Sequence, residues 1–279
     1  MLSFVKKPIE RKVGHMTASE LIEIFEDTQK MIRQDPFLQE RVVASQCASQ
    51  LYLEQYTSPN RQIKGDGSVE VVENTTFQCA RELHPRFSKI AVLNFANPYE
   101  PGGGVLRGAM AQEECLCRCS DLYNVLAQPY FLKHYYQHHY RNGDHYFSDR
   151  LIYSPNIIVL KSDDSIPQIL DKPFCVDVIT CAAPYLKGCN KPDDALLAIY
   201  RSRIRNILEV AMSQEVDCLV LGAFGCGAFH NDPQFMAEAF ADLLVGENYA
   251  PFFQKVVFAI KRTGVHCRNL SAFQAVFAL

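Results

Sequence analysis

Residues 90–105 read IAVLNFANPYEPGGGV, and this stretch decides the fold. Its first six residues form a short apolar run of the length and type of a buried strand, and a turn and three glycines follow. Consecutive glycines let a backbone approach a ligand closely and take positive φ values, so that successive amides can converge on an anion. Because α/β folds bind ligands where strands end, we expect phosphate contacts at Gly102, Gly103 and Gly104. The alternative is a flexible surface turn; neither GxGxxG spacing after a strand nor a Walker lysine is present.

After the glycines and seven intervening residues, the chain reads Gln112-Glu113-Glu114. An isolated triplet of this kind is typical of an exposed helix start, where the helix dipole favours acidic side chains. Beside a loop that holds an anion, two carboxylates would repel the ligand unless they take part in its chemistry. A glutamate next to a second glutamate, and partly desolvated by a ligand, is expected to have a raised pKa and to hold a proton near neutral pH.

A second glycine loop follows in LVLGAFGCGAFHNDP, residues 219–233. A buried strand again enters a loop, and Asn231 or Asp232 can cap the helix beyond it. Two such loops on neighbouring strand ends can hold one elongated anionic ligand from both sides. Phe229 either packs in the core or stacks on a base or ribose.

Strands and helices alternate through most of the chain. We expect strands at residues 69–72, 90–95, 157–160, 176–180, 218–221 and 256–260, and helices at 76–83 and 195–212, the latter begun by Pro192-Asp193-Asp194. The pattern predicts a three-layer α/β sandwich with a mostly parallel or mixed sheet. Residues 128–150 are polar and aromatic.

The first 60 residues are expected to be a helical extension packed on the core, before a catalytic domain at 61–279. Thr17 and Glu20 have the spacing of a capping box at the start of a first helix, and a second helix is expected over residues 36–56.

Composition excludes several classes of protein. The 279 residues carry a net charge of −3 without a basic stripe, which argues against nucleic-acid binding by bulk charge. No apolar run reaches the roughly 18 residues that a membrane span needs, and the N-terminus lacks the apolar region of a secretory signal. The odd count of 11 cysteines, many of them in apolar segments, indicates reduced core thiols of a cytosolic protein.

No metal or cofactor is expected. The spacing of Cys115, Cys117 and Cys119 does not suit zinc, and His134 and His138 lack the glutamate of a metalloprotease helix, so we expect a solvated aromatic flap there. Cys226 has no histidine that the sequence assigns to it as a base.

Together, these segments carry a family resemblance. The Asn94-Phe95-Ala96-Asn97 and Gly-Gly-Gly-Val pattern resembles the ADP-ribose loop of macrodomains. With QEE seven residues later, VEVVENTTFQCA (69–80), VITCAAPYL (178–186) and LGAFGCGAFHNDP (221–233), the chain is similar to microbial-type poly(ADP-ribose) glycohydrolases from about Glu70 to Leu279. The resemblance implies a macrodomain-like fold and cleavage of the ribose O-glycosidic bond.

The resemblance also implies roles for single residues. Glu114 would be the acid/base, and Glu113 and Asn97 would bind the distal ribose. The remaining ligand contacts would come from Gln112, from Gly102, Gly103 and Gly104, and from Gly225, Cys226, Gly227, Ala228 and Phe229. The bulky residues 97–100 depart from the family and bear on polymer access.

The expected substrates are ADP-ribose polymers or ADP-ribosylated proteins, with no membrane and no direct nucleic-acid partner. A macrodomain that reads ADP-ribose without cleaving it is the main alternative, and a transferase or a nucleotide-phosphate hydrolase is a third. The acidic triplet favours the hydrolase, because a reader needs no proton donor there.

Overall fold

The computed structural model describes residues 16–53, 55–188, 193–262 and 267–278. Within these ranges, strands form one mixed sheet in the order β1-β4-β5-β3-β6-β7-β2. They are β1 (Gln50–Tyr52), β2 (Val69–Val72), β3 (Ile90–Phe95), β4 (Leu151–Lys161), β5 (Ile169–Cys181), β6 (Cys218–Leu221) and β7 (Lys255–Ala259). The strands expected near 157, 176 and 256 are confirmed with longer or shifted ends, and those at 69–72, 90–95 and 218–221 with the same bounds.

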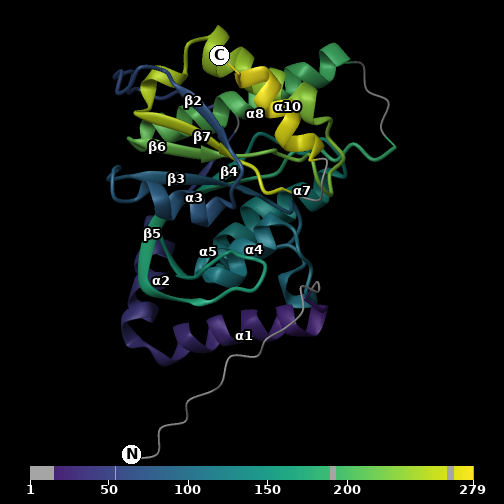
Figure 1. Cartoon of the computed structure of the whole chain (residues 1–279). Helices are drawn as coiled ribbons and strands as arrows, with labels where there is room; N and C mark the ends of the chain where they lie inside the picture. Colours follow the sequence, from purple (N-terminus) through teal and green to yellow (C-terminus); the bar gives the residue numbers. More distant parts are fainter. Residues whose placement is uncertain (1–15, 54, 189–192, 263–266, 279) are drawn as a thin grey trace, which may run out of the picture.

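Helices cover both faces of the sheet (Figure 1). They are α1 (Ala18–Gln34), α2 (Pro36–Ala48), α3 (Thr76–Leu83), α4 (Gln112–Cys119), α5 (Leu122–Leu126), α6 (Pro129–Phe131), α7 (Gln137–Asn142), α8 (Asp193–Ser213), α9 (Pro233–Ala241) and α10 (Arg268–Phe277). Short 3-10 or π turns lie at Val105–Arg107, Leu132–Tyr136, Asp242–Gly246 and Ala250–Phe252.

The alternation of side chains along β3 builds two cores. Ala91 and Leu93 pack in one core with α8, α9 and α10, whereas Ile90 and Val92 pack in the other with α3, α4 and α5. This period of two places helices above and below the sheet, as Figure 1 shows. The predicted three-layer α/β sandwich with a mixed sheet is confirmed.

The N-terminal region is helical only in part. The capping box is confirmed: the Thr17 backbone N–H donates to Glu20 Oε2 (2.8 Å), and the Glu20 N–H donates to Thr17 Oγ1 (3.3 Å). The second helix ends at Ala48 and not at Tyr56, because the chain turns into β1 and pairs antiparallel with β4. The division at residue 60 stays a prediction.

The polar, aromatic stretch at 128–150 is not a solvated flap. Its residues 129–142 fold as α6, a π turn and α7, and the side chains of Tyr135, Tyr136 and His139 are buried. The expectation failed because the apolar ring faces of these residues pack into the core. Residues 1–15 and Pro192, which the sequence analysis singled out, lie outside the described residues.

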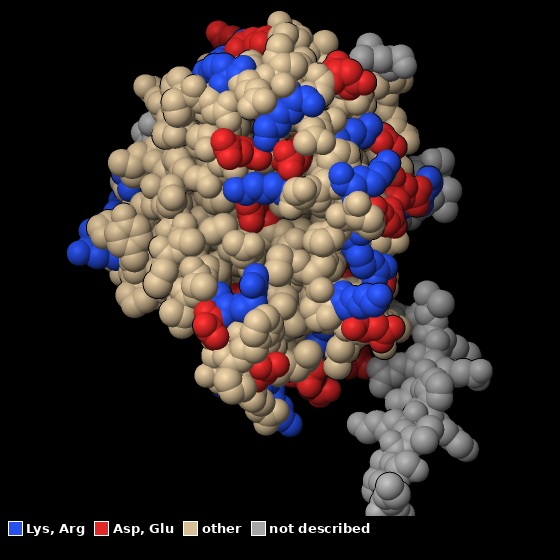
Figure 2. Space-filling view, turned by 90° about the vertical axis from the view of Figure 1, so that its left-hand side faces the viewer, with Lys and Arg blue, Asp and Glu red and all other residues tan. Residues whose placement is uncertain are grey.

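Charges of both signs lie interspersed on the face that Figure 2 shows, with no broad patch of one sign. Among the described residues, no helix combines the length and the apolar character that crossing a bilayer requires.

Candidate active site

Three neighbouring strands end at the edge of the sheet where both glycine loops begin. β3 is parallel to β5 and to β6, so that Val92 lies beside Val178 on one side and Val220 on the other. Parallel strands place their carboxyl ends together, which is where open α/β sheets bind ligands. The predicted placement of the two loops on neighbouring strand ends is confirmed.

Glu113 lies buried behind the first glycine loop. Its Oε2 accepts the backbone N–H of Asn97 (2.6 Å), and its Oε1 accepts Nδ2 of Asn94 (3.2 Å), which also donates to Thr180 Oγ1 (3.2 Å). The pKa of the Glu113 carboxyl is raised to about 8, mainly by burial and to a smaller extent by the nearby Glu114, against the lowering effect of the hydrogen bonds from Asn97 and Asn94. The raised pKa expected within the acidic pair is thus found at Glu113, which carries a proton near neutral pH.

Glu114 fixes the glycine loop to the start of α4. Its Oε1 accepts the backbone N–H of Gly104 (2.8 Å) and its Oε2 accepts that of Ala111 (2.9 Å). Glu114 is only 7% exposed. The alternative interpretation of the acidic triplet, an exposed helix start, is therefore wrong. Each carboxylate oxygen has a second lone pair, which leaves room for a proton.

The first glycine loop packs directly on these carboxylates. A Cβ at Gly103, which has φ +56°, would lie 2.5 Å from Glu114 Oε1 and 3.2 Å from Glu113 Oε2. Glycine is therefore required here by its approach to the two glutamates. The contacts of residues 102–104 with a ligand stay a prediction.

Gln112 joins α4 to β3. Its Oε1 accepts the Phe95 N–H (2.9 Å), and its Nε2 donates to the Leu93 carbonyl (2.8 Å) and to Thr76 Oγ1 (3.1 Å). These bonds set the first turn of α4, on which both glutamates lie. The predicted contact of Gln112 with a ligand stays a prediction.

Asn97 shapes the turn between β3 and the glycines. Its Oδ1 accepts the backbone N–H groups of Tyr99 (2.8 Å) and Glu100 (3.1 Å). Of the bulky residues of this turn, Tyr99 and Glu100 lie at the surface, Tyr99 being 40% exposed, whereas Pro98 is buried. The ribose contact of Asn97 stays a prediction.

The second glycine loop is held by one buried side chain. Asn231 Nδ2 donates to the carbonyls of Pro184 (2.8 Å), Gly225 (3.0 Å) and Phe229 (3.3 Å), and its Oδ1 accepts the hydroxyl of Tyr200. The sequence offered Asn231 or Asp232 as the cap of the next helix. Asp232 is the cap, and Asn231 ties the loop to the segment that follows β5.

The same loop presents free amides. Within the described residues, no acceptor is found for the backbone N–H groups of Gly225, Gly227, Ala228 and Phe229. A Cβ at Gly227 would meet no atom within 4 Å. Burial raises the pKa of the Cys226 thiol to about 12, so this residue is no thiolate nucleophile at neutral pH. The loop thus offers several donors to an anion.

A row of rings joins the two loops, and we call Tyr99, Phe147, Phe229 and Tyr185 the aromatic row. Ring centroids are 5.7 Å apart for Tyr99 and Phe147, 6.2 Å for Phe147 and Phe229, and 5.7 Å for Phe229 and Tyr185. Sequence reasoning missed Phe147 and Tyr185; the aromatic composition of residues 128–150 was the only signal for the former.

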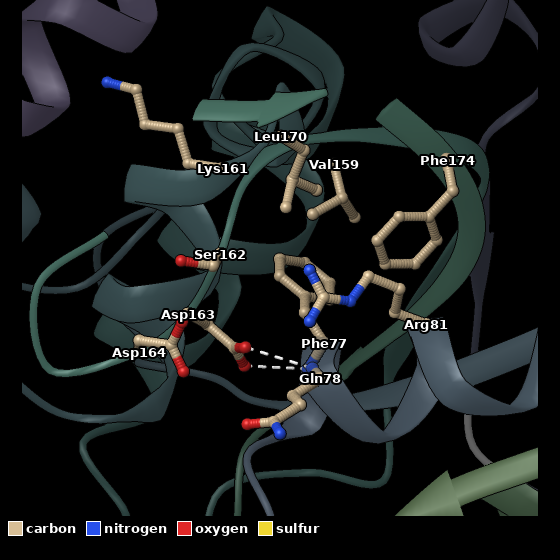
Figure 3. A pocket seen from close by; sticks show the side chains of 10 residues that line it. All are labelled: Phe77, Gln78, Arg81, Val159, Lys161, Ser162, Asp163, Asp164, Leu170 and Phe174. Atoms are coloured by element: carbon tan, nitrogen blue, oxygen red, sulfur yellow. Dashed lines mark hydrogen bonds between the residues drawn. The ribbon is translucent and has the colours of Figure 1, made fainter. Parts of the chain in front are cut away.

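Two hollows lie outside the carboxyl pair. The first, of about 10 Å³, holds at most one water; Asp163 beside it accepts the N–H groups of Phe77 (2.7 Å) and Gln78 (3.0 Å) and caps α3 (Figure 3). The second, of about 270 Å³, adjoins the second glycine loop, and its walls include Gly227 and Arg268.

No group of three potential metal-binding side chains occurs in the described part of the chain, where the cysteines are free thiols.

Comparisons with known proteins agree with this geometry. The family described as "Microbial-type PARG, catalytic domain" matches residues 18–162. The crystal structure of poly(ADP-ribose) glycohydrolase from Thermomonospora curvata is 31% identical, covers 92% of this chain and 99% of its own, and has a TM-score of 0.81. The same enzyme bound to the inhibitor ADP-HPD matches equally well.

The enzyme from Deinococcus radiodurans in complex with ADP-ribose is 33% identical, with a TM-score of 0.74 and coverage of 85% of this chain and 96% of its own. A search among curated proteins finds none that matches. The resemblance inferred from the glycine loops and the acidic triplet is confirmed: the chain belongs to the microbial-type poly(ADP-ribose) glycohydrolase family.

Proposed function

We propose that this protein hydrolyses the ribose O-glycosidic bond of ADP-ribose modifications and releases ADP-ribose from poly(ADP-ribose) or from ADP-ribosylated protein. The observation that carries the proposal is the buried carboxyl pair of Glu113 and Glu114, held beneath one glycine loop, with the second loop following the neighbouring parallel strand. Membership of the family supports it, as do the relatives solved with ADP-ribose and with ADP-HPD.

Glu114 is proposed as the acid/base. Its carboxyl donates a proton to the leaving oxygen as the bond to the anomeric carbon breaks through an oxocarbenium-like transition state. The resulting carboxylate then takes a proton from a water, whose oxygen bonds to the anomeric carbon. Two backbone amides fix both carboxylate oxygens, so the acid is already oriented before the substrate arrives.

The other groups are proposed to hold the ligand. Glu113, protonated near neutral pH, offers a hydrogen bond to a ribose hydroxyl, and as a neutral group it adds no negative charge beside the ligand. The free amides of the second loop suit a pyrophosphate. Binding energy from this remote contact would keep the ribose at the acid. No resident metal is needed for any of these steps, and a reducing intracellular compartment is proposed from the free thiols.

The test is the release of ADP-ribose from poly(ADP-ribosyl)ated and from singly modified protein. We expect Glu114→Gln to lose about 10²–10⁴-fold in rate while it still binds ADP-ribose in calorimetry, because the amide keeps the shape and loses the proton. The amide also leaves one of the two backbone N–H groups without an acceptor, so folding is verified by thermal unfolding.

Glu209→Gln is a matched control. Glu209 is a buried glutamate that likewise accepts a backbone N–H, from Ser58 (2.8 Å), but it lies on α8 away from the carboxyl pair. Its rate should stay near that of the wild type. A rate of Glu114→Gln within a few-fold of the wild type would contradict the role of Glu114, and a wild type that binds ADP-ribose but releases none would make the protein a reader.

A further inference from the structure

Phe147 has a backbone conformation that a phenylalanine rarely adopts. Its φ is +58°, in the left-handed region, where non-glycine residues are uncommon and are mostly Asn, Asp or His. Such a conformation costs free energy and persists only where the surroundings fix it. Strained residues cluster at ligand-binding sites, so the position of this one decides what it means.

Contacts on both sides of the residue fix this conformation. Arg203, 2% exposed on α8, donates from Nη2 to the Tyr146 carbonyl (2.9 Å), from Nε to Asp149 Oδ1 (3.1 Å), and from Nη1 to the Ala182 carbonyl just beyond β5 (2.8 Å). One guanidinium thus holds the chain before and after Phe147 and connects it to the strand end at the candidate site. The ring position is therefore set by the core and not by solvent.

The ring itself stands between the two glycine loops. Its neighbours in the aromatic row are Tyr99, from the turn before the first loop, and Phe229, from the end of the second. On its other side it meets the buried ring of His139, at 6.0 Å. The residue is half-buried, so these contacts do not shield it fully from solvent.

We propose that Phe147 is a ligand-contact residue: an ADP-ribose unit that reaches from the first glycine loop to the second lies against its ring. The inference rests on the proposed function and adds a residue to it. The strain at residue 147 is retained because it turns the ring into the gap between the loops, where an apolar ring face suits the carbon face of a ribose or a base. Ordinary packing would not require this backbone, since a residue with negative φ fills a core equally well.

The experiment separates the ring from the strain. Phe147→Ala removes the ring and keeps an unfavourable backbone, whereas Phe147→Gly removes both. We expect both variants to bind ADP-ribose roughly 10- to 100-fold more weakly by calorimetry, the range given by the loss of one stacked ring. KM should rise with a smaller change in kcat. Phe147→Gly should nevertheless unfold at a higher temperature than Phe147→Ala.

Two further variants serve as controls. Phe147→Tyr keeps the ring and should keep the affinity within a few-fold. Glu215→Gly relieves the same kind of backbone at φ +57°, on an exposed residue after α8, and should leave both affinity and rate unchanged.

Affinity of folded Phe147→Gly within twofold of the wild type would overturn the inference and leave the ring as packing. A wild type that binds ADP-ribose but releases none would overturn the hydrolase function alone, because the affinity comparison still holds. A wild type without affinity for ADP-ribose would overturn both.

Discussion

The two glycine loops carry the same kind of sequence, yet the structure uses them differently. At Gly103 of the first loop, a side chain would collide with the carboxylates of Glu114 and Glu113. At Gly227 of the second, it would enter open space. The amides of Gly104 in the first loop and of Ala111 at the helix start are occupied by Glu114, whereas four amides of the second loop have no acceptor within the described residues.

Glycine therefore has two different structural roles in this site. In the first loop it lets the backbone cover a pair of acids, and in the second it leaves room and free donors beside the loop. Damage to the first loop should appear in the chemical step, and damage to the second should appear in affinity.

The largest effect is expected from Gly103→Ala. The new Cβ must displace Glu114 Oε1 and must also adopt φ +56°, so the rate should fall about 10²–10⁴-fold, as for loss of an acid/base. ADP-ribose affinity should change less. Steady-state kinetics and calorimetry measure the two effects. Gly143→Ala, at φ +59° with no atom within 4 Å of the added Cβ, controls for backbone strain alone. If Gly103→Ala and Gly143→Ala lost the same amount of rate, the contact of residue 103 with the carboxylates would not be the cause of the loss.

Gly227→Val is expected to act in the opposite way. Its backbone needs no positive φ and its surroundings are open, so the fold should tolerate the change. The isopropyl group would enter the space proposed for the pyrophosphate and weaken ADP-ribose binding roughly 10- to 100-fold, as overpacking does. At saturating substrate kcat should stay near that of the wild type. An unchanged dissociation constant would remove the second loop from the binding site.

Asn231→Ala should have a smaller effect on affinity. It removes three donated hydrogen bonds that shape the second loop without removing the amides themselves, so we expect a several-fold rise in KM and a loss of about 1–3 kcal/mol in stability. Tyr200→Phe, which removes only the hydroxyl that donates to Asn231, should raise KM less and lower the stability less. The arrangement of the loop does not depend on Asn231 if KM is unchanged while stability falls.

The smallest effect is a slope in the pH dependence of stability. Glu113 holds its proton up to about pH 8 in the folded protein, whereas an unfolded glutamate loses it near 4.5. The unfolded chain binds fewer protons between these values, so the free energy of unfolding falls as pH rises from about 4.5 through about 8.

Glu113→Gln has no proton to lose at this position. Its stability relative to the wild type should improve by about 1 kcal/mol or more across that range, as measured by denaturant unfolding at several pH values. Burial also raises the pKa of Asp121, to about 7, but this residue is present in both proteins and its contribution cancels in the difference. If the free energies of unfolding of the two proteins changed with pH in parallel, Glu113 would be ionised in the folded protein.

Local patterns were enough to predict much of the fold. The strand at 218–221 and the capping box at Thr17 are each encoded within a few neighbouring residues, and the structure has both. β1 was missed because its pairing partner, β4, lies about a hundred residues further along the chain. The backbone strain at Phe147 could not be predicted from the sequence either, because an arginine on α8 imposes it.

The candidate site divides in the same way. The two loops and the acidic pair were found from spacing, and their proximity follows from parallel strands. The spacing of these residues did not predict the direction in which each group faces. Gly103 faces Glu114, and the Asn231 side chain faces the loop carbonyls.

The contacts of α1 with α4 and with β4 bear on how the chain folds. Thr28 Oγ1 donates to the Arg118 carbonyl (2.6 Å), 90 residues later, and Lys161 Nζ donates to the Ile24 carbonyl (3.0 Å), 137 residues later. During synthesis α1 emerges long before either partner, with the apolar face of Leu21, Phe25 and Ile32 uncovered. Closing such long loops is slow. The last turn of α4 should therefore gain protection from hydrogen exchange late, together with α1.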